Sequence, residues 1–171
     1  NLYFMTKIIL GSQSKWRKAI LQRMGYDRFE VMTADIDEKA IRFDDPHRLA
    51  MALANAKADA LLPKIRGSAI LITSDQVDVC NGQIREKPKD PEQAREFLRS
   101  YNKYPVETVT AVVAVNTGNQ KRKEGLDIVK VYFNSLSDEK INELVANGCV
   151  FSCAGGFCIN DPAFNGLIER V

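Results

Sequence analysis

The sequence predicts an α/β fold in which helices flank a mixed, twisted sheet. Apolar, β-branched runs alternate with helical patterns through the first half of the 171-residue chain, as expected for strands covered by helices. Further along, strand patterns at 106–117 and 126–133 are separated by a polar turn, which indicates an antiparallel hairpin. A chain that combines helix-linked strands with a hairpin favours a mixed sheet.

Short runs of apolar and β-branched residues define the expected strands. They lie at residues 7–10, 29–33, 69–73, 77–84, 106–117, 126–133 and 167–171. The run 69–73 is apolar throughout, so we expect an interior strand there. Asn81-Gly82 lies inside the run 77–84 and is a strong signal for a two-residue hairpin turn.

Helical spacing and end signals define four expected helices. They span residues 14–24, 46–62, 90–101 and 137–146. The third has the clearest start, because Asp90 can cap it, Pro91 suits its first position and Gln93 can complete a capping box. In the second, one apolar stripe is expected to contain Leu49, Leu53, Ala56 and Ala60.

Composition indicates a globular protein. The hydrophobic share is 45%, the charged share 27% and the formal net charge +2, which does not favour nucleic acid as a partner. No apolar run approaches the roughly 20 residues of a membrane span, and no secretory pattern is visible. We therefore expect a cytoplasmic protein without a membrane partner. Residues 1–4 resemble the remnant of a protease-site tag, so residues 5–171 are taken as a single domain.

Few side chains are available for nucleophilic or zinc chemistry. The chain has one histidine, His47, and its four cysteines form no CxxC pair. A zinc site and a histidine-dependent nucleophile are therefore not expected, and the thiols are expected to be reduced. Acid–base chemistry would fall to carboxylates and lysines.

The most informative segment is residues 10–18. A buried strand breaks at Gly11 into a loop with Ser12 and Ser14, and a basic helix carrying Arg17 follows directly. Free backbone N–H groups at a helix start, together with hydroxyls and cations, suit a phosphate. The alternative is an ordinary corner in which Ser14 only caps the helix.

Three further charged residues are candidates for the same chemistry. Asp75 is expected at the end of the 69–73 strand, at the rim of the sheet, where it could hold a divalent cation or deprotonate a water. Alternatively, it caps a turn. Lys87 precedes Pro88 and should project from extended backbone, and Lys57 lies among small alanines. Each lysine could clamp a phosphate or be solvated on the surface.

In combination, these residues suit a metal–triphosphate complex. The phosphate-type ligands are Ser12, Ser14, Arg17, Lys57 and Lys87, and the metal-type ligands are Asp35, Asp37, Glu38 and Asp75. A Mg²⁺ ion would bridge the two sets. Neither G-x-x-x-x-G-K-[ST] nor G-x-G-x-x-G occurs, so any nucleotide would bind through another fold.

The ordered motifs resemble the Maf family of nucleotide pyrophosphatases, relatives of the inosine triphosphate pyrophosphatase superfamily. The resemblance runs from residue 8 to residue 171, and it is carried by residues 12–17, 35–38, 74–77, 86–88, 108–110, 154–155 and the alanine-rich segment around Lys57. It implies two lobes around a central cleft, frequent homodimers, and hydrolysis of a nucleoside triphosphate to the monophosphate and pyrophosphate with Mg²⁺ or Mn²⁺.

The resemblance also implies roles for individual residues. Ser12 and Arg17 would bind phosphates, and Lys57 and Lys87 would converge on the same group. Fixed cations there would stabilise the charge that develops on the leaving pyrophosphate. The carboxylates have separate implied roles: Asp75 as metal ligand or general base, and Glu38 as support for the metal or its loop.

Two features resemble the subgroup that acts on 7-methyl-GTP. That subgroup reads Ser-Asp-Gln at residues 74–76 and has a tryptophan before the arginine of the first motif, as Trp16 is here. Trp16 could stack on the cationic methylated guanine, or it could be a core residue of the first helix. Gln76 and Glu169 could read the edge of the base. The expected function is therefore removal of 7-methyl-GTP from the nucleotide pool.

Other readings stay open beside this one. A dTTP/UTP pyrophosphatase is the alternative within the family, although that subgroup reads Ala-Asp-Thr at residues 74–76. A non-catalytic nucleotide-binding regulator of cell division is the alternative from another class. Segment 160–165 departs from the family pattern. The family's closing Gly-Leu-Pro segment and last helix do not follow Val171, and a fold without them is expected to expose apolar surface.

Overall fold

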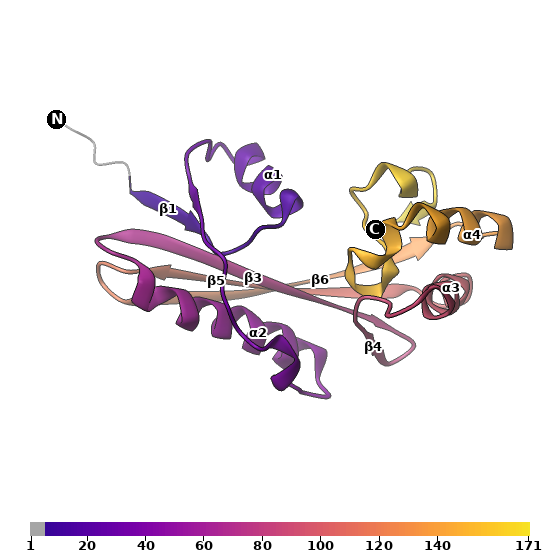
Figure 1. The fold of residues 1–171 in the computed structure, drawn as a ribbon, viewed down its shortest axis with the longest axis horizontal. Helices are drawn as coiled ribbons and strands as arrows, with labels where there is room; N and C mark the ends of the chain where they lie inside the picture. Colours follow the sequence, from indigo (N-terminus) through magenta and orange to yellow (C-terminus); the bar gives the residue numbers. More distant parts are fainter. Residues whose placement is uncertain (1–5) are drawn as a thin grey trace. The chain divides into compact units, whose positions relative to one another are not determined.

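The computed structural model of this chain describes residues 6–171 (Figure 1). The predicted tag remnant and the native start at Met5 lie outside the described residues. The chain divides into two compact units. The first contains the described residues up to Asp75 together with Ala111–Leu126, and the second contains Gln76–Thr110 together with Asp127–Val171. The central cleft expected for two lobes stays a prediction.

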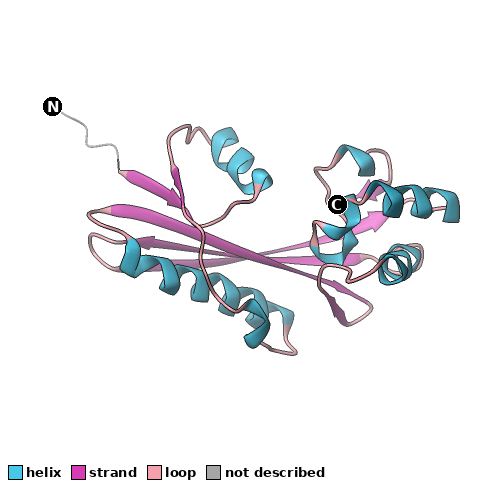
Figure 2. Cartoon of the chain, in the orientation of Figure 1, coloured by secondary structure: helices cyan, strands magenta, loops and turns pink. Residues whose placement is uncertain are grey.

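Strands and helices follow the predicted order closely (Figures 1 and 2). The strands are β1 (Lys7–Leu10), β2 (Glu30–Val31), β3 (Ala69–Cys80), β4 (Gln83–Arg85), β5 (Val106–Asn116), β6 (Lys121–Phe133) and β7 (Ile168–Arg170). The α-helices are α1 (Lys15–Arg23), α2 (Pro46–Leu61), α3 (Pro91–Ser100) and α4 (Asp138–Asn147). Short 3₁₀ turns are η1 (Glu38–Ala40), η2 (Leu62–Lys64), η3 (Cys149–Phe151), η4 (Ala154–Gly156) and η5 (Pro162–Phe164).

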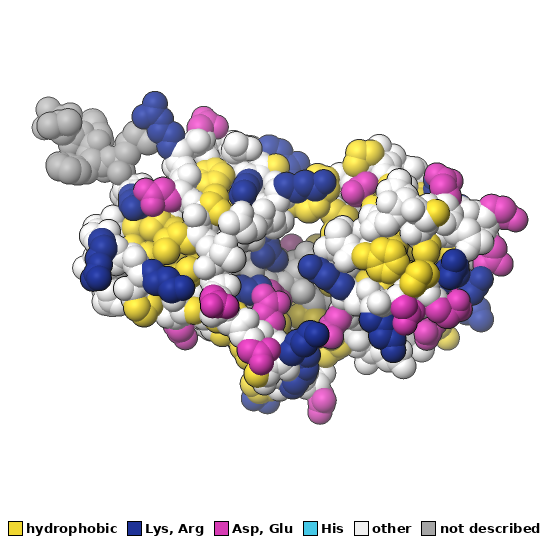
Figure 3. Space-filling model, in the orientation of Figure 1, with side chains coloured by type: hydrophobic (Ala, Val, Ile, Leu, Met, Phe, Trp, Pro, Cys, Tyr) yellow, Lys and Arg dark blue, Asp and Glu magenta, His cyan; other side chains and the backbone are white. Residues whose placement is uncertain are grey.

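The predicted mixed sheet is confirmed. Its strands lie in the order β2-β1-β3-β5-β6-β7, and β4 pairs with β3. β1 runs parallel to both β2 and β3, whereas the β3–β4 and β6–β7 pairs are antiparallel. The long strands β3, β5 and β6 each contribute residues to both units. On the face drawn in Figure 3, basic and acidic side chains are interspersed.

Helix α2 packs closely against β3 in the first unit. Its buried stripe includes Ala50, Ala54 and Ala58, each fully buried. Because alanine has no bulk beyond Cβ, the helix backbone approaches the sheet, and the Thr73 hydroxyl donates to the carbonyl oxygen of Ala54 at 2.8 Å. The predicted stripe was wrong in part: Leu49 and Leu53 are buried, but Ala56 and Ala60 are partly exposed. The face that α2 packs against the sheet determines which of its alanines are buried.

Two predicted boundaries also differ from the structure. Residues 69–73 and 77–84 were expected as separate elements, but β3 continues unbroken through Asp75 to Cys80. The basic segment after Gly118 was expected to be a turn, yet β6 begins at Lys121, because an exposed strand face tolerates the charged side chains there. The predicted Asn81-Gly82 turn is confirmed, since it joins β3 to β4 with Cys80 opposite Gln83.

An aromatic cluster forms part of the second unit's core. The rings of Tyr101 and Phe133 stack with centroids 5.1 Å apart, and Phe157 meets them edge-on at 5.7 and 5.2 Å. Helices α3 and α4 contribute Leu98 and Ile141 to the same core. This core supports the chain segment after α4, which the sequence predicts to be loop-like and which contains the three turns η3, η4 and η5. Within the described residues, no helix is long and apolar enough to cross a membrane.

Gly11 controls the corner between β1 and α1. Its N–H donates to the carbonyl oxygen of Ile72 at 2.8 Å. A Cβ atom there would lie 2.6 Å from Cγ2 of Thr73 and 2.7 Å from Cδ1 of Leu61, both fully buried residues. We predict that Gly11→Ala lowers the free energy of unfolding by about 1–3 kcal/mol, because the added methyl overpacks the corner.

Urea denaturation monitored by circular dichroism measures this change. Gly125→Ala is the matched control, because a Cβ atom at Gly125 meets no atom within 4 Å. Equal stabilities of the two variants would contradict the tight corner.

Candidate active site

The loop after β1 places two hydroxyls and a guanidinium together. Ser12 is buried, and its Oγ accepts from the N–H of Ser14 at 3.2 Å and from Nη1 of Arg17 at 3.3 Å. Ser14 caps α1, because its side chain accepts from the backbone N–H of Arg17 at 3.4 Å. Ser14 therefore caps the helix, and its part in phosphate binding stays a prediction. The structure brings Ser12 and Arg17 together, as predicted.

Lys57 lies between two carboxylates. Its Nζ is 3.0 Å from Oε1 of Glu38 and makes a short hydrogen bond to Oδ1 of Asp75. The side chains of Lys57 and Asp75 are only 13% and 12% exposed, whereas that of Glu38 is 55% exposed. The surface alternative for Lys57 is thus wrong. The small alanines of α2 bring its backbone close to β3, so the lysine reaches the strand instead of the solvent.

The position of Asp75 differs from the prediction. It was expected at a strand end, but it lies within β3. The pairing of β1 with β3 ends at Leu10 opposite Ile72. Beyond that point β1 turns away through Gly11, so β3 runs on without β1 beside it. Asp75 therefore has room for side-chain partners from α2 and η1 although its own strand continues.

Burial and charge act against each other in this cluster. Burial raises the pKa of Asp75, while the ammonium of Lys57 and the guanidinium of Arg17 oppose that rise. Burial likewise lowers the pKa of Arg17, and the carboxylates of Asp75 and Glu38 oppose that fall. Four elements, α1, η1, α2 and β3, thus supply cations and carboxylates whose mutual attraction opposes the effect of burial on their pKa values.

Glu38 and Asp75 are the two carboxylates of this cluster that could hold a divalent cation. Glu38 and Asp75 both direct an oxygen at Lys57 Nζ, so a positive charge already occupies the point where they converge. No group of three or more histidine, cysteine, aspartate or glutamate residues within 6–171 could hold a metal. Two protein carboxylates suit Mg²⁺, which completes its shell with water and substrate phosphates.

Of the acidic loop residues, only Glu38 belongs to this cluster. Asp37 caps the turn η1 by accepting from the N–H of Lys39 at 3.1 Å, and Asp35 is exposed. The metal-type role considered for Asp35 and Asp37 is therefore not supported. Asp37 instead stabilises the turn that presents Glu38.

Trp16 is partly exposed on α1, in the same helix as Arg17. The Nζ of Lys15 lies 4.4 Å from the centroid of the indole ring. The indole is thus neither buried in a core nor free of cations, since one ammonium already uses its π-face.

The remaining predicted residues belong to the second unit. Gln76 is exposed and donates from Nε2 to Oδ1 of Asp78 at 3.4 Å. Lys87 is exposed, and its neighbour Pro88 is buried beneath the turn at Gly156, whose Cβ position lies 3.1 Å from Cγ of the proline. Glu169 is exposed on β7 and, among the described residues, has no hydrogen bond to Gln76.

Asp78 was missed by the sequence reasoning. It is fully buried, and neither its Oδ2 nor the Oγ1 of Thr108 has a hydrogen-bond partner within the described part of the chain. Burial raises the pKa of Asp78 to about 7, against the influence of the Thr108 hydroxyl and the Gln76 amide. The signal was present in the sequence: a single carboxylate between Val77 and Val79, in the run 77–84 that was expected to be a strand.

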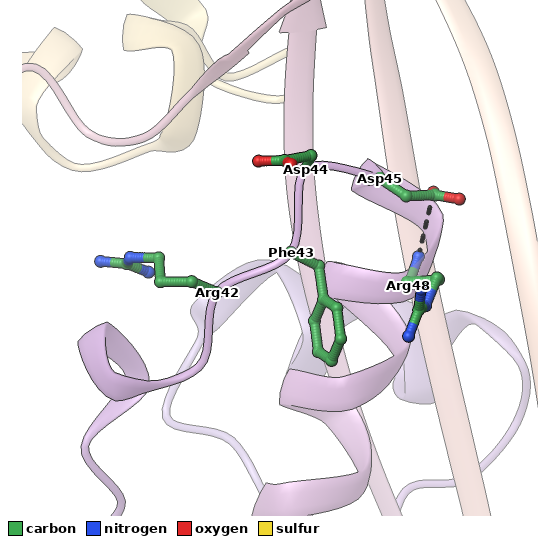
Figure 4. Close-up of a pocket in the computed structure, with 5 residues that line it drawn as sticks. All are labelled: Arg42, Phe43, Asp44, Asp45 and Arg48. Atoms are coloured by element: carbon green, nitrogen blue, oxygen red, sulfur yellow. Dashed lines mark hydrogen bonds between the residues drawn. The ribbon is translucent and has the colours of Figure 1, made fainter.

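A separate hollow of about 450 Å³ lies beside the N-terminus of α2 (Figure 4). It is lined by Arg42, Phe43, Asp44, Asp45 and Arg48. Asp45 caps α2 through the N–H groups of His47 and Arg48 at 2.8 and 3.2 Å, and the Arg48 guanidinium lies 4.7 Å from the Phe43 ring centroid. None of the predicted site residues lines this hollow, so it is not the candidate active site.

Comparison with known proteins gives consistent results. A family model described as "Maf-like protein" matches residues 7–171. A 7-methyl-GTP pyrophosphatase of Dictyostelium discoideum is 48% identical over 163 residues, covering 91% of this chain and 82% of that protein. A 7-methyl-GTP pyrophosphatase of Idiomarina loihiensis is 38% identical over 151 residues (88% and 76%). A dTTP/UTP pyrophosphatase of Geotalea uraniireducens is 35% identical over 162 residues (92% and 80%).

The buried carboxyl of Asp78 gives a pH-dependent prediction. Its pKa is about 7 in the folded protein against an ordinary value of 3.8, so the folded state holds the proton more tightly. The stability that this proton provides is present below about pH 4 and is lost as the pH rises to about 7. Asp78→Asn has no proton to lose and should gain on the order of 2–4 kcal/mol relative to the unsubstituted protein between pH 4.5 and 8.

Urea unfolding of both proteins at several pH values measures that gain. Asp127→Asn, at an exposed position of β6, is the control and should show little pH-dependent difference. A constant stability difference between Asp78→Asn and the unsubstituted protein across the range would contradict the buried-acid assignment.

Proposed function

Because the chain belongs to the Maf-like protein family, we propose that it hydrolyses a nucleoside triphosphate, foremost 7-methyl-GTP, to the monophosphate and pyrophosphate. The two relatives with 48% and 38% identity that are named 7-methyl-GTP pyrophosphatases support this substrate. Removal of modified nucleotides from the pool would be the biological result.

One observation carries the proposed reaction: the ammonium of Lys57 lies between Glu38 and Asp75 in the first unit. In the loop after β1 and in α1, Ser12 and Arg17 hydrogen-bond to each other, and the charge of Arg17 interacts with that of Asp75. A mixture of fixed cations and carboxylates is what a metal–triphosphate complex requires, because each part of the complex meets its opposite charge.

The proposed metal ligands are Glu38 and Asp75. When bound, Mg²⁺ or Mn²⁺ would supply Lewis-acid polarisation of the phosphate oxygens. Lys57 would then exchange its contact with Glu38 for a phosphate oxygen, and it would keep Asp75 ionised. Asp75 would also be placed to accept the proton of the water that attacks the α-phosphorus.

The phosphate-binding set proposed for the chain is Ser12, Ser14, Arg17, Lys57 and Lys87. Ser14 would contribute through the helix start that it caps, where free N–H groups favour an anion. Bound cations stabilise the negative charge that accumulates on the departing pyrophosphate. The side chain of Lys87 is exposed, which leaves its ammonium available.

Base recognition is proposed for Trp16, Gln76 and Glu169. Methylation at N7 gives guanine a positive charge, and a cation on an indole gains up to roughly 2 kcal/mol when it is desolvated. Lys15 occupies that position over the ring in the free protein, so a methylated base would have to displace it or use the other face. The expected homodimer and cytoplasmic location belong to the same proposal.

A dTTP/UTP pyrophosphatase is the second candidate, supported by the relative of that name with 35% identity. A non-catalytic nucleotide-binding regulator is less well supported. A protein that only binds nucleotide has no need of a buried carboxylate such as Asp75 beside the lysine and arginine.

We predict that Asp75→Asn and Lys87→Ala each lower pyrophosphate release at least 100-fold without unfolding the protein. Asp75→Asn removes the charge that holds Lys57 and the metal, and Lys87→Ala removes a cation from the phosphates. Release of pyrophosphate from 7-methyl-GTP with Mg²⁺ or Mn²⁺ is the measurement, with circular dichroism to verify folding.

The matched control is Asp59→Asn. Like Asp75, Asp59 is a carboxylate in an ion pair; it lies on α2 and its partner is Arg122. It should keep full turnover. Full turnover of both Asp75→Asn and Lys87→Ala would show that the site is assigned wrongly.

We predict that a screen of ordinary and methylated nucleoside triphosphates with each metal gives the highest kcat/KM for 7-methyl-GTP.

Trp16→Leu should lower the preference for 7-methyl-GTP over GTP by about 10-fold, because it removes the π-face that favours a cation. Faster turnover of UTP than of 7-methyl-GTP would favour the second candidate, and silence across the whole panel would favour the regulator.

A further inference from the structure

We propose that Asp78 is a positioning residue that fixes the carboxamide of Gln76 with its oxygen directed at the nucleobase. This inference rests on the proposed function, in which Gln76 reads the base edge. It extends that function from a single nucleotide to a class of substrates: bases that present a ring N–H donor to this oxygen.

The contact between the two side chains determines the amide orientation. Asp78 follows Gln76 by two residues on β3, so both side chains lie on the same face of the strand. Oδ1 of Asp78 lies 3.4 Å from Nε2 of Gln76. A carboxylate only accepts hydrogen bonds, so the amide nitrogen must face it. The amide oxygen Oε1 is then left for a ligand, because Gln76 is exposed.

A proton on Asp78 would not reverse this arrangement. Oδ2 has no hydrogen-bond partner within the described part of the chain, so a proton carried there leaves Oδ1 as an acceptor. With the proton on Oδ2, the Gln76 amide keeps the orientation that it has beside the carboxylate.

The carboxyl group of Asp78 has little freedom to turn. A Cβ atom at Gly155 would lie 3.0 Å from Oδ2 of Asp78 and 3.0 Å from Oη of Tyr101. Oη of Tyr101 in turn donates to the carbonyl oxygen of Gly155, which ties the turn η4 to α3. Gly155 has φ +65°, a conformation that favours glycine. A buried acid enclosed by a glycine turn is suited to hold a neighbouring side chain in one rotamer.

An outward amide oxygen selects among bases by hydrogen-bond chemistry. Guanine and its 7-methyl derivative present N1–H and N2–H donors, and uracil and thymine present N3–H. Adenine and cytosine donate only from their exocyclic amines, N6 and N4, and the ring nitrogen beside each amine presents a lone pair that would repel the lone pairs of Oε1. The inference therefore predicts a preference for guanine-type and uracil-type bases over adenine and cytosine.

A double-mutant cycle on Gln76 and Asp78 tests the inference. The readout is the ratio of kcat/KM for 7-methyl-GTP to that for ATP. Asp78→Val and Gln76→Ala should each lower this ratio about 10-fold, mainly through KM for 7-methyl-GTP. The double variant should lose about 10-fold rather than about 100-fold, because Asp78 acts only through Gln76. Valine is chosen because Val77 and Val79 flank Asp78 in the same strand.

The conservative variant provides a second readout. Asp78→Asn keeps an acceptor oxygen for Nε2 and should hold the ratio within about 3-fold of the unsubstituted protein. If Asp78→Val does not fold, Asp78→Ala takes its place in the cycle.

Three results would overturn the inference: an unchanged ratio in the Asp78 variants with lower turnover of every nucleotide, additive losses in the double variant, or an equal loss in Asp78→Asn and Asp78→Val. Failure of the proposed function would be visible separately, as absence of pyrophosphate release from any nucleotide by the unsubstituted protein.

Discussion

The ammonium of Lys57 and the carboxylate of Asp75 depend on each other inside the first unit. Each is largely removed from water, and an unpaired charge in such a place is strongly unfavourable. The pair is therefore possible only where both side chains arrive together. The alanines of α2 make that possible, because they let the helix approach β3 until the lysine reaches the strand.

The other polar residues of the first unit follow from the end of β1. Pairing with β3 stops at Leu10, and the chain turns away at Gly11. The loop then delivers Ser12 and Arg17 to the part of β3 that β1 no longer covers, where Arg17 is close enough to Asp75 for their charges to interact. Because β1 ends early, one edge of β3 beside Asp75 is left uncovered, and the residues that follow β1 occupy that space. The early end of β1 therefore explains why residues distant in sequence share one charged cluster.

The buried carboxyl group of the second unit, that of Asp78, has a different environment. Asp78 has no cation among the groups that shift its pKa, which burial raises to about 7. Its polar neighbours are an amide and a hydroxyl, and a glycine turn covers it. A carboxyl group that is kept near neutrality loses little by burial and still offers an acceptor oxygen. Such a group can orient a neighbour, whereas Asp75, which is paired with Lys57, is suited to bind cations.

Local signals accounted for most of the elements. The cap at Ser14, the start of α3 at Asp90 and the turn at Asn81-Gly82 were all predictable, because each depends on a few adjacent residues. The grouping of Ser12 with Arg17 was predictable for the same reason, since one strand–loop–helix segment contains both. The continuation of β3 through Asp75 was not, because it depends on a partner strand far along the chain.

The sequence by itself determined which side chains could do chemistry, and the resemblance of its motifs to the Maf family determined the roles expected of them. Only the tertiary structure decided that Lys57 is buried against Asp75 and Glu38, that Asp37 is a cap, and that Asp78 is enclosed beneath Gly155. The physical reason is that charge and hydrogen-bonding capacity belong to single residues. Burial and pairing belong to contacts between elements that only the folded chain brings together.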